Sequence, residues 1–376
     1  MSSKNNISTY LKKRGVQQPW KLEPHPHRKF EHAIVVPAYA EYEQLPSLLG
    51  SIAENNAIHL KNILVVIVVN NSENADQQIR TNNLNTLNYL KKSKFHFQLG
   101  WVDCVQGNNS LPKKQAGVGL ARKIGIDLVL PYLKSAESLI FSTDADVILH
   151  PDYLSTVIHY FNNDEVQAAV VGFRHTASDD PQIEKGIREY EEFLYNTAEK
   201  LHNAGSPYGY VAMGSTMVCR AGAYVAAGGM PRKKATEDFY FMQELAKYAG
   251  VTHIPEKLVF PSPRPVSRVY LGTGFRMKQI ELGFNIQSLH YSEKAFSMLE
   301  NWLTLGSSSW NTSLVKLKIK IQKLSPELME FLHKEGIHDI WENLQKTAPS
   351  TLHFEKQFHR WFDALKTLRL LKNFLN

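Results

Sequence analysis

The chain has 376 residues, of which 43% are hydrophobic and 21% are charged. This balance is typical of a globular protein with a sizeable core, and it excludes a disordered chain, a collagen and a repeat array. The formal net charge of +7 suits an anionic partner such as a nucleotide, but it is also that of an ordinary mildly basic protein. The scattered lysines and arginines form no motif that reads nucleic acid.

The sequence also limits the expected location of the protein. No apolar run reaches the roughly 18 residues that a membrane-spanning helix needs. The first fifteen residues, MSSKNNISTYLKKRG, contain no hydrophobic core of a secretory signal, so we expect a cytoplasmic protein. Cys104 and Cys219 are far apart in the sequence, so we expect two buried, inert thiols and no disulfide framework or zinc site.

Strand-like and helix-like segments alternate through the first half of the chain. We expect strands at 33–36, 63–69, 95–102, the run 139–141 that leads into Ser142, Thr143 and Asp144, and 168–173. We expect helices at 43–54, 75–91, 113–130, from Pro151 onward, and 181–204. This alternation predicts an α/β fold with a mostly parallel sheet.

The second half of the chain has a different character. Glycines crowd residues 205–229, which predicts loops and tight turns, and residues 261–276 have the composition of an extended basic loop. From about 285 the pattern is largely helical, except that VKLKIKIQK (315–323) alternates and predicts a strand with a lysine face. We therefore expect three parts: an N-terminal arm (1–30), an α/β domain (31–280) and a mostly helical C-terminal region (281–376).

Two carboxylates, Asp144 and Asp146, follow an apolar run at the predicted end of a strand. In parallel α/β sheets, ligands bind at the carboxyl ends of the strands. Two neighbouring carboxylates that are partly buried repel each other when both are ionised, and a divalent cation relieves that repulsion. The pattern indicates a Mg²⁺ or Mn²⁺ site, and the alternative is a surface turn with two solvated acids.

A second acidic pair, Glu237 and Asp238, stands at the start of a predicted helix. Thr236 is a candidate cap for that helix, whose N-terminus favours negative charge. The turn predicted at Gly228-Gly229 would deliver the pair to a cleft. A purely structural acidic first turn remains the alternative.

Four segments, in order, resemble motifs of glycosyltransferases with the GT-A fold, most closely those of family 2. They match the family's V-P-x-Y-N-E strand end, its arginine-containing helix, its D-x-D strand and its G-G…E-D segment. The segments are IVVPAYAEYEQLPSLLGSI, GLARKIGID, STDADVILHPDYL and GAYVAAGGMPRKKATEDFYFMQELAKYAG. The resemblance spans residues 33 to about 250. It implies a GT-A type, Rossmann-like, mostly parallel sheet flanked by helices, with a largely helical C-terminal extension.

The resemblance implies a hexosyltransferase-like enzyme that uses a UDP- or GDP-sugar, Mg²⁺ or Mn²⁺, and an acceptor hydroxyl of unknown identity. Asp144 would lie near the ribose and the metal, and Asp146 would ligate the metal. In inverting members, which we favour, the residue at Asp238 takes a proton from the acceptor, with Glu237 beside it. Residues expected at the nucleotide by matching position or charge are Pro37, Tyr39, Glu41, Lys113, Lys114 and Arg122.

The chain departs from the family pattern at two places. Asn70 and Asn71 end the second strand where an acidic pair is usual, although their amides can still bind a base or a ribose. Ala40 stands where asparagine is usual.

A basic loop adds three further candidates, Arg264, Arg268 and Arg276, which surround Gly272-Thr273-Gly274. Such a loop can close on a diphosphate or on an anionic acceptor. It is similar to loops of transferases that glycosylate glycerate or phosphoglycerate, some of which are retaining; in a retaining enzyme Asp238 would position the acceptor. His253 and His290 are candidates for a third metal ligand.

Two other classes of protein remain open. A sugar-phosphate nucleotidyltransferase usually has a glycine-rich loop after its first strand, and PAYAEYEQ contains no glycine. A non-catalytic protein that keeps the fold is the second. The sequence also leaves open a homodimer and a peripheral membrane contact through the lysine face at 315–323.

Overall fold

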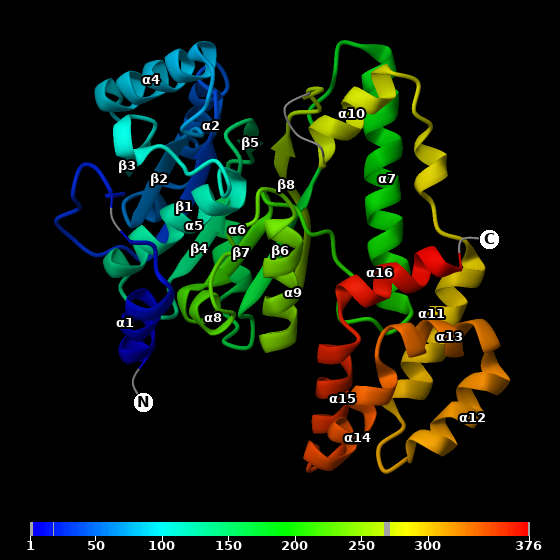
Figure 1. Ribbon diagram of the computed structural model, residues 1–376. Helices are drawn as coiled ribbons and strands as arrows, with labels where there is room; N and C mark the ends of the chain where they lie inside the picture. The colour runs from blue at the N-terminus through cyan, green and yellow to red at the C-terminus, as the bar shows by residue number, and fades with distance from the viewer. Residues whose placement is uncertain (1–2, 18, 267–270, 375–376) are drawn as a thin grey trace. The chain divides into compact units, whose positions relative to one another are not determined.

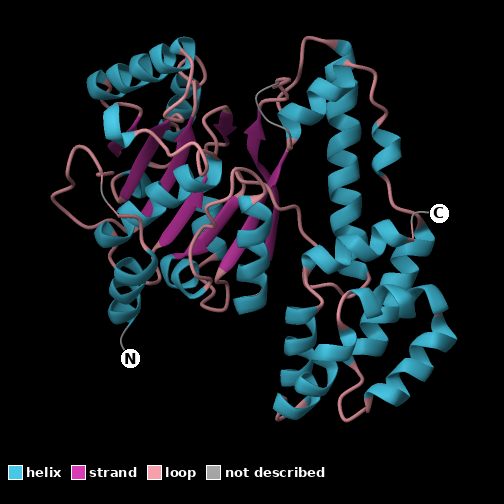
Figure 2. Ribbon diagram, in the orientation of Figure 1, coloured by secondary structure: helices cyan, strands magenta, loops and turns pink. Residues whose placement is uncertain are grey.

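The computed structural model describes residues 3–17, 19–266 and 271–374. These residues form two compact units. The first comprises Met1–Ile187 and Ala212–Gly283, and the second comprises Arg188–Val211 and Phe284–Asn376. Every described strand lies in the first unit, and the regular elements described in the second unit are all helical (Figure 2).

One eight-stranded sheet organises the first unit, in the order β3-β2-β1-β4-β7-β6-β8-β5 (Figure 1). Strands β1 to β4 run parallel, β7 runs antiparallel to both of its neighbours, and β5 pairs antiparallel with β8. The strands are β1 (His32–Ala38), β2 (Ile63–Asn70), β3 (Gln98–Cys104), β4 (Leu139–Ser142), β5 (Val147–Leu149), β6 (Ala168–Phe173), β7 (Met217–Arg220) and β8 (Thr252–Pro261).

The helices of the first unit connect and flank these strands. They are α1 (Ser3–Arg14), α2 (Leu45–Ala53), α3 (Ala57–Leu60), α4 (Gln77–Lys92), α5 (Val118–Val129), α6 (Tyr153–Tyr160), α8 (Ala221–Ala226), α9 (Glu237–Ala249), α10 (Thr273–Glu281) and the start of α7 (Pro181–Asn203), with 3₁₀ turns at Gly107–Asn109 and Leu130–Tyr132. The predicted fold class, a mostly parallel α/β sheet followed by a helical region, is confirmed.

The central strands form because their residues suit burial on both faces. All eight residues of β2, ILVVIVVN, are buried. Such β-branched runs are typical of parallel strands that helices cover on both sides. The Asp76 side chain accepts a hydrogen bond from the Ile79 amide at 2.9 Å and thereby starts α4.

Several predicted boundaries and elements were wrong. The glycine-rich segment contains β7 and α8, because pairing in the sheet outweighs local composition there. The predicted basic loop at 261–276 shares its first residue with β8, and its last four residues lie in α10. The helix predicted from residue 113 begins at Val118, after the extended Gly117.

The second unit has its own aromatic core. Its buried aromatic side chains include Trp302, Trp341, Phe354, Phe358 and Phe362. Its helices are the remainder of α7, α11 (Glu293–Ser307), α12 (Leu314–Leu324), α13 (Pro326–Lys334), α14 (Ile337–Thr347), α15 (Thr351–Trp361) and α16 (Ala364–Asn373), with a 3₁₀ turn at Ile286–Leu289.

The strand predicted at 315–323 is wrong, because these residues lie in α12. The Ser313 side chain caps the helix by accepting a hydrogen bond from the Lys316 amide. Leu317 and Ile321 lie one helical turn apart and are buried, so a period of four explains their burial as well as a period of two does. Within the described residues, no helix is long and apolar enough to cross a membrane.

Candidate active site

The candidate site lies where the order of the sheet reverses. The chain passes from β1 to β2 and β3 on one side, and β4 joins β1 on the other side. Such a switch point leaves a crevice at the carboxyl ends of the parallel strands, where α/β proteins bind ligands. Tyr39 and Glu41 follow β1 at this edge, and Asp144 and Asp146 follow β4.

Arg122 of α5 joins two motifs that are far apart in the sequence. Its guanidinium forms ion pairs with Asp144 after β4 and with Glu237 at the start of α9. Its Nε donates a hydrogen bond to Ser142 Oγ at 3.1 Å. Arg122 is 2% exposed, so these partners compensate a charge that would be costly to bury alone. The D-x-D segment and the E-D segment therefore meet at one cation.

Gly214 makes room for this cation. A Cβ atom at Gly214 would overlap the guanidinium of Arg122, so a larger residue would displace either the loop or the arginine. Burial raises the pKa of Asp238, and a hydrogen bond donated by the amide of Gly214 partly offsets that rise. The loop before β7 thus contacts both the arginine and the second acid of the pair.

Burial raises the pKa of both acids in the E-D pair. The pKa of Glu237 rises to about 7, chiefly because the side chain is buried, although Arg122 opposes the shift. The pKa of Asp238 also rises for the same reason. The predicted cap of their helix is wrong: Thr236 has a left-handed φ of 64° and makes no side-chain cap bond. The turn predicted at Gly228-Gly229 is present, with φ values of 88° and 80°.

Asp146 lies in a second cluster with Glu41 and Arg264. Arg264 Nη2 is 2.8 Å from one carboxylate oxygen of Glu41 and 3.6 Å from Asp146 Oδ2. The pKa of Asp146 is raised to about 7 by burial and by the neighbouring Asp144 and Glu41, and Arg264 only partly offsets this. Arg264, from the predicted basic loop, thus lies beside the proposed metal ligand.

The ends of β1 and β2 are tied together by Asn83 of α4, which the sequence analysis missed. Its Nδ2 donates to the Asn70 carbonyl and to Asn71 Oδ1, both at 3.0 Å, and its Oδ1 accepts from the Ala40 amide at 2.9 Å. Ala40 has a positive φ of 54°, a conformation that asparagine tolerates better than alanine. The asparagine usual at position 40 in the family pattern was the available signal that this turn is left-handed.

Two buried oxygens at this edge lack a protein partner. Among the described residues, neither Asn70 Oδ1 nor Thr143 Oγ1 has a hydrogen-bond partner. Buried polar atoms in folded proteins nearly always form hydrogen bonds. Two such atoms without a partner, at the carboxyl ends of parallel strands, therefore suit contact with a ligand or water. Thr143 and Ser142 were not predicted as site residues, although both directly precede the D-x-D motif.

The other predicted residues are placed less centrally. Pro37 is buried within β1, and Lys113 and Lys114 are exposed in the turn before α5. Arg276 lies on α10, where its Nη1 donates to Gln279 at 2.6 Å. Arg268 lies outside the described residues.

The two candidate histidines differ in how far the structure tests them. His253 as a third metal ligand is wrong: it lies near the start of β8, whereas Pro261 at the other end pairs with Val147, next to Asp146. The eight residue-to-residue steps from His253 to Pro261 span roughly 26 Å of strand. His290 belongs to the second unit, with its ring 5.3 Å from that of Phe193, and its proposed role stays a prediction.

No three described His, Cys, Asp or Glu side chains gather into a complete ion-binding set. Mg²⁺ and Mn²⁺ are often held by one or two carboxylates, with substrate phosphates and water completing the shell. Asp144 and Asp146, whose side chains are 35% and 27% exposed, fit that mode of binding.

Comparison with known proteins gives similarity of fold only. No family model matches the chain, and no curated protein matches it in sequence. Among solved structures, Staphylococcus aureus TarS (residues 1–349, with UDP-GlcNAc) is 14% identical, with a TM-score of 0.44, over 88% of this chain and 89% of that one. The mannosyltransferase PcManGT from Pyrobaculum calidifontis, with GDP-Man and Mn²⁺, is 13% identical, with a TM-score of 0.42, over 94% of each chain. Function must therefore be argued from this chain's own residues.

Proposed function

We propose that this chain is a metal-dependent glycosyltransferase that moves a sugar from a nucleotide-diphosphate sugar to a hydroxyl acceptor. The observation that carries the proposal is the pairing of Arg122 with both Asp144 and Glu237. This pairing brings the two acidic motifs to the switch point of the sheet, which is the general ligand site of such folds.

The donor would bind at the ends of β1, β2 and β4. Asn70 Oδ1 and Thr143 Oγ1, which are buried without described partners, suit hydrogen bonds to the base or the ribose. Arg264, beside Glu41 and Asp146, suits the diphosphate, because a guanidinium binds phosphate oxygens through two parallel hydrogen bonds. Lys113 and Lys114, exposed in the turn before α5, add positive charge for an anionic donor.

Asp144 and Asp146 would hold Mg²⁺ or Mn²⁺, with the diphosphate completing the shell. When bound, the metal supplies positive charge that stabilises the diphosphate as it leaves. Arg264 would add charge at the same group and so help to separate it from the sugar.

Asp238 would act as the general base of an inverting transfer. It would accept the proton of the acceptor hydroxyl as that oxygen bonds to the anomeric carbon and the bond to the diphosphate breaks. Its raised pKa makes it a stronger base than an exposed aspartate. Arg122 and Glu237 would position the first turn of α9, since neither is exposed enough to reach a substrate freely.

Product analysis tests the proposal. The chain, Mn²⁺ and a panel of UDP- and GDP-sugars should release nucleoside diphosphate, slowly with water and faster with the right acceptor. Release of pyrophosphate from a nucleoside triphosphate and a sugar phosphate would instead identify a nucleotidyltransferase. The absence of turnover and of binding with every donor would leave only a non-catalytic protein with this fold.

A further inference from the structure

Helix α12 presents two different faces. Its sequence, LVKLKIKIQKL, contains four lysines and no carboxylate. Leu317 and Ile321 are fully buried in the aromatic core of the second unit. Val315 and Ile319 also lie one turn apart, but they are 69% and 54% exposed. We call these two exposed side chains the apolar ridge.

Lysines stand on both sides of the apolar ridge. At 100° per residue, Lys318 lies on one side of it, and Lys316 and Lys323 lie on the other. None of these three, nor Lys320, forms an ion pair with a described carboxylate. The face therefore combines exposed aliphatic carbon with uncompensated positive charge.

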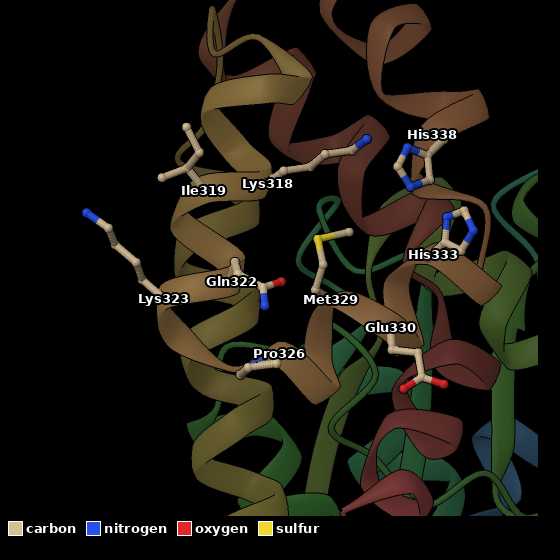
Figure 3. Close-up of a pocket in the computed structure, with 9 residues that line it drawn as sticks. All are labelled: Lys318, Ile319, Gln322, Lys323, Pro326, Met329, Glu330, His333 and His338. Carbon is tan, nitrogen blue, oxygen red and sulfur yellow. The ribbon is translucent and has the colours of Figure 1, made fainter.

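A hollow of about 800 Å³ adjoins this face, between α12 and α13. In Figure 3, Ile319 and Lys323 project from one side of α12, while Lys318 extends along the hollow toward His338. The single carboxylate that lines it, Glu330, pairs with Lys334 at 2.7 Å, so its charge is offset. The hollow thus extends the positive surface.

We propose that α12 and the adjoining hollow rest on the surface of an anionic lipid bilayer. The apolar ridge would enter the headgroup boundary, and the flanking lysines would bind anionic headgroups while their stems lie along the lipid. The proposal depends neither on the candidate active site nor on a metal.

A lipid surface fits this face better than a protein partner does. Protein interfaces are enriched in tryptophan, tyrosine and arginine and depleted in lysine. The sequences of α12 and α13, LVKLKIKIQKL and PELMEFLHK, contain none of those three anchors, and five of their twenty residues are lysine. A mobile lysine needs no fixed partner at a fluid anionic surface, where each contributes about 1 kcal/mol.

Vesicle sedimentation with the full chain tests the charge. We expect binding to phosphatidylcholine vesicles that contain phosphatidylglycerol, weaker binding as salt increases, and little binding to pure phosphatidylcholine. The double variant K316Q/K323Q should bind less, by about fivefold for each lysine. The matched control is K91Q/K92Q, two exposed lysines in the last turn of α4, which should bind as the wild type does.

The apolar ridge has its own matched pair. Ile319→Ser should weaken vesicle binding by about tenfold through the lost apolar contact, and Ile58→Ser, at a residue that is 71% exposed on α3, should not. Equal binding to neutral and anionic vesicles, or unchanged binding of the α12 variants, would overturn the proposal. A dimer that Ile319→Ser dissociates, without vesicle binding, would make the face a contact between copies and overturn it equally.

Discussion

Helix α5 carries two adjacent buried cations, Arg122 and Lys123, which are 2% and 4% exposed. Each lies among carboxylates, but the surroundings differ. Arg122 pairs with Asp144, whose side chain is 35% exposed at the edge of the sheet, whereas Lys123 pairs with Asp127, whose side chain is 1% exposed. Burial and ion pairing alone therefore do not mark a candidate active site; an accessible partner carboxylate does.

The cluster around Lys123 is structural. Asp127 accepts hydrogen bonds from Tyr10 at 2.9 Å and from Tyr224 at 2.8 Å, which joins α1 to α8 through α5. The Tyr10 hydroxyl also accepts a bond from Lys123 at 2.7 Å. A Cβ atom at Gly229 would overlap this hydroxyl, so α1 packs directly on the turn before the E-D pair. Helix α1 thus contacts both α5 and the turn that precedes the E-D pair.

The largest expected effect is at Asp238, one of the carboxylates near Arg122. Asp238→Asn should lower the transfer rate by about 10²–10⁴-fold, because the amide cannot accept the acceptor's proton. The thermal midpoint should not fall, since the substitution removes a charge whose burial is unfavourable. The measurement is turnover with Mn²⁺ and the donor that binds. Glu244→Gln, at an exposed residue of the same helix, is the control; a variant at Asp238 with wild-type turnover would refute the assignment of the base.

Arg122→Met comes next. It leaves Asp144 and the buried Glu237 without their cation, so the free energy of unfolding should fall by on the order of 3 kcal/mol. Donor affinity should fall with it, because the two acidic segments lose their shared partner. Urea titration and calorimetry measure the two quantities. Unchanged donor affinity in the folded variant would show that the ion pairs do not organise the site.

Lys123→Met, the same kind of substitution one residue away, should separate structure from function. We expect a smaller loss of unfolding free energy, about 2 kcal/mol, because Tyr10, Tyr224 and the Val16 amide still bond to Asp127. Metal-dependent nucleotide affinity should stay within about twofold of the wild type. A selective loss of that affinity would place the cluster around Lys123 in the binding machinery.

The last prediction concerns the pH dependence of stability. Folding raises the pKa of Asp146 from 3.8 to about 7, so between these values the native state holds more protons than the unfolded state does. The stability contributed by this group is present at low pH and is lost as the pH rises through 7. In urea titrations, Asp146→Asn should be more stable than the wild type, by a margin that grows from pH 4 to pH 8; an equal margin at both values would contradict the shift.

The sequence predicted most of the parallel strands and where their carboxyl ends lie. This was possible because an apolar run such as 63–69 shows a buried strand in the local sequence alone. It missed β5, β7 and β8, which are short or irregular strands defined by pairing with distant parts of the chain. It placed Arg122 near the nucleotide on motif position alone. The pairing of that arginine with Asp144 and Glu237 depends on contacts across 22 and 115 residues, which no local pattern encodes.

Titration calorimetry of the metal-free chain with UDP- and GDP-sugars, with and without Mn²⁺, tests the central claim most directly. Asp146→Asn provides the test variant, and Asp152→Asn, at a side chain that is 73% exposed in the same segment, is the matched control. We predict that a nucleotide sugar binds the wild type and the control only with Mn²⁺, and that Asp146→Asn loses this metal-dependent binding. Binding that is unchanged by Mn²⁺ or by Asp146→Asn would contradict a metal-anchored diphosphate site at the end of β4.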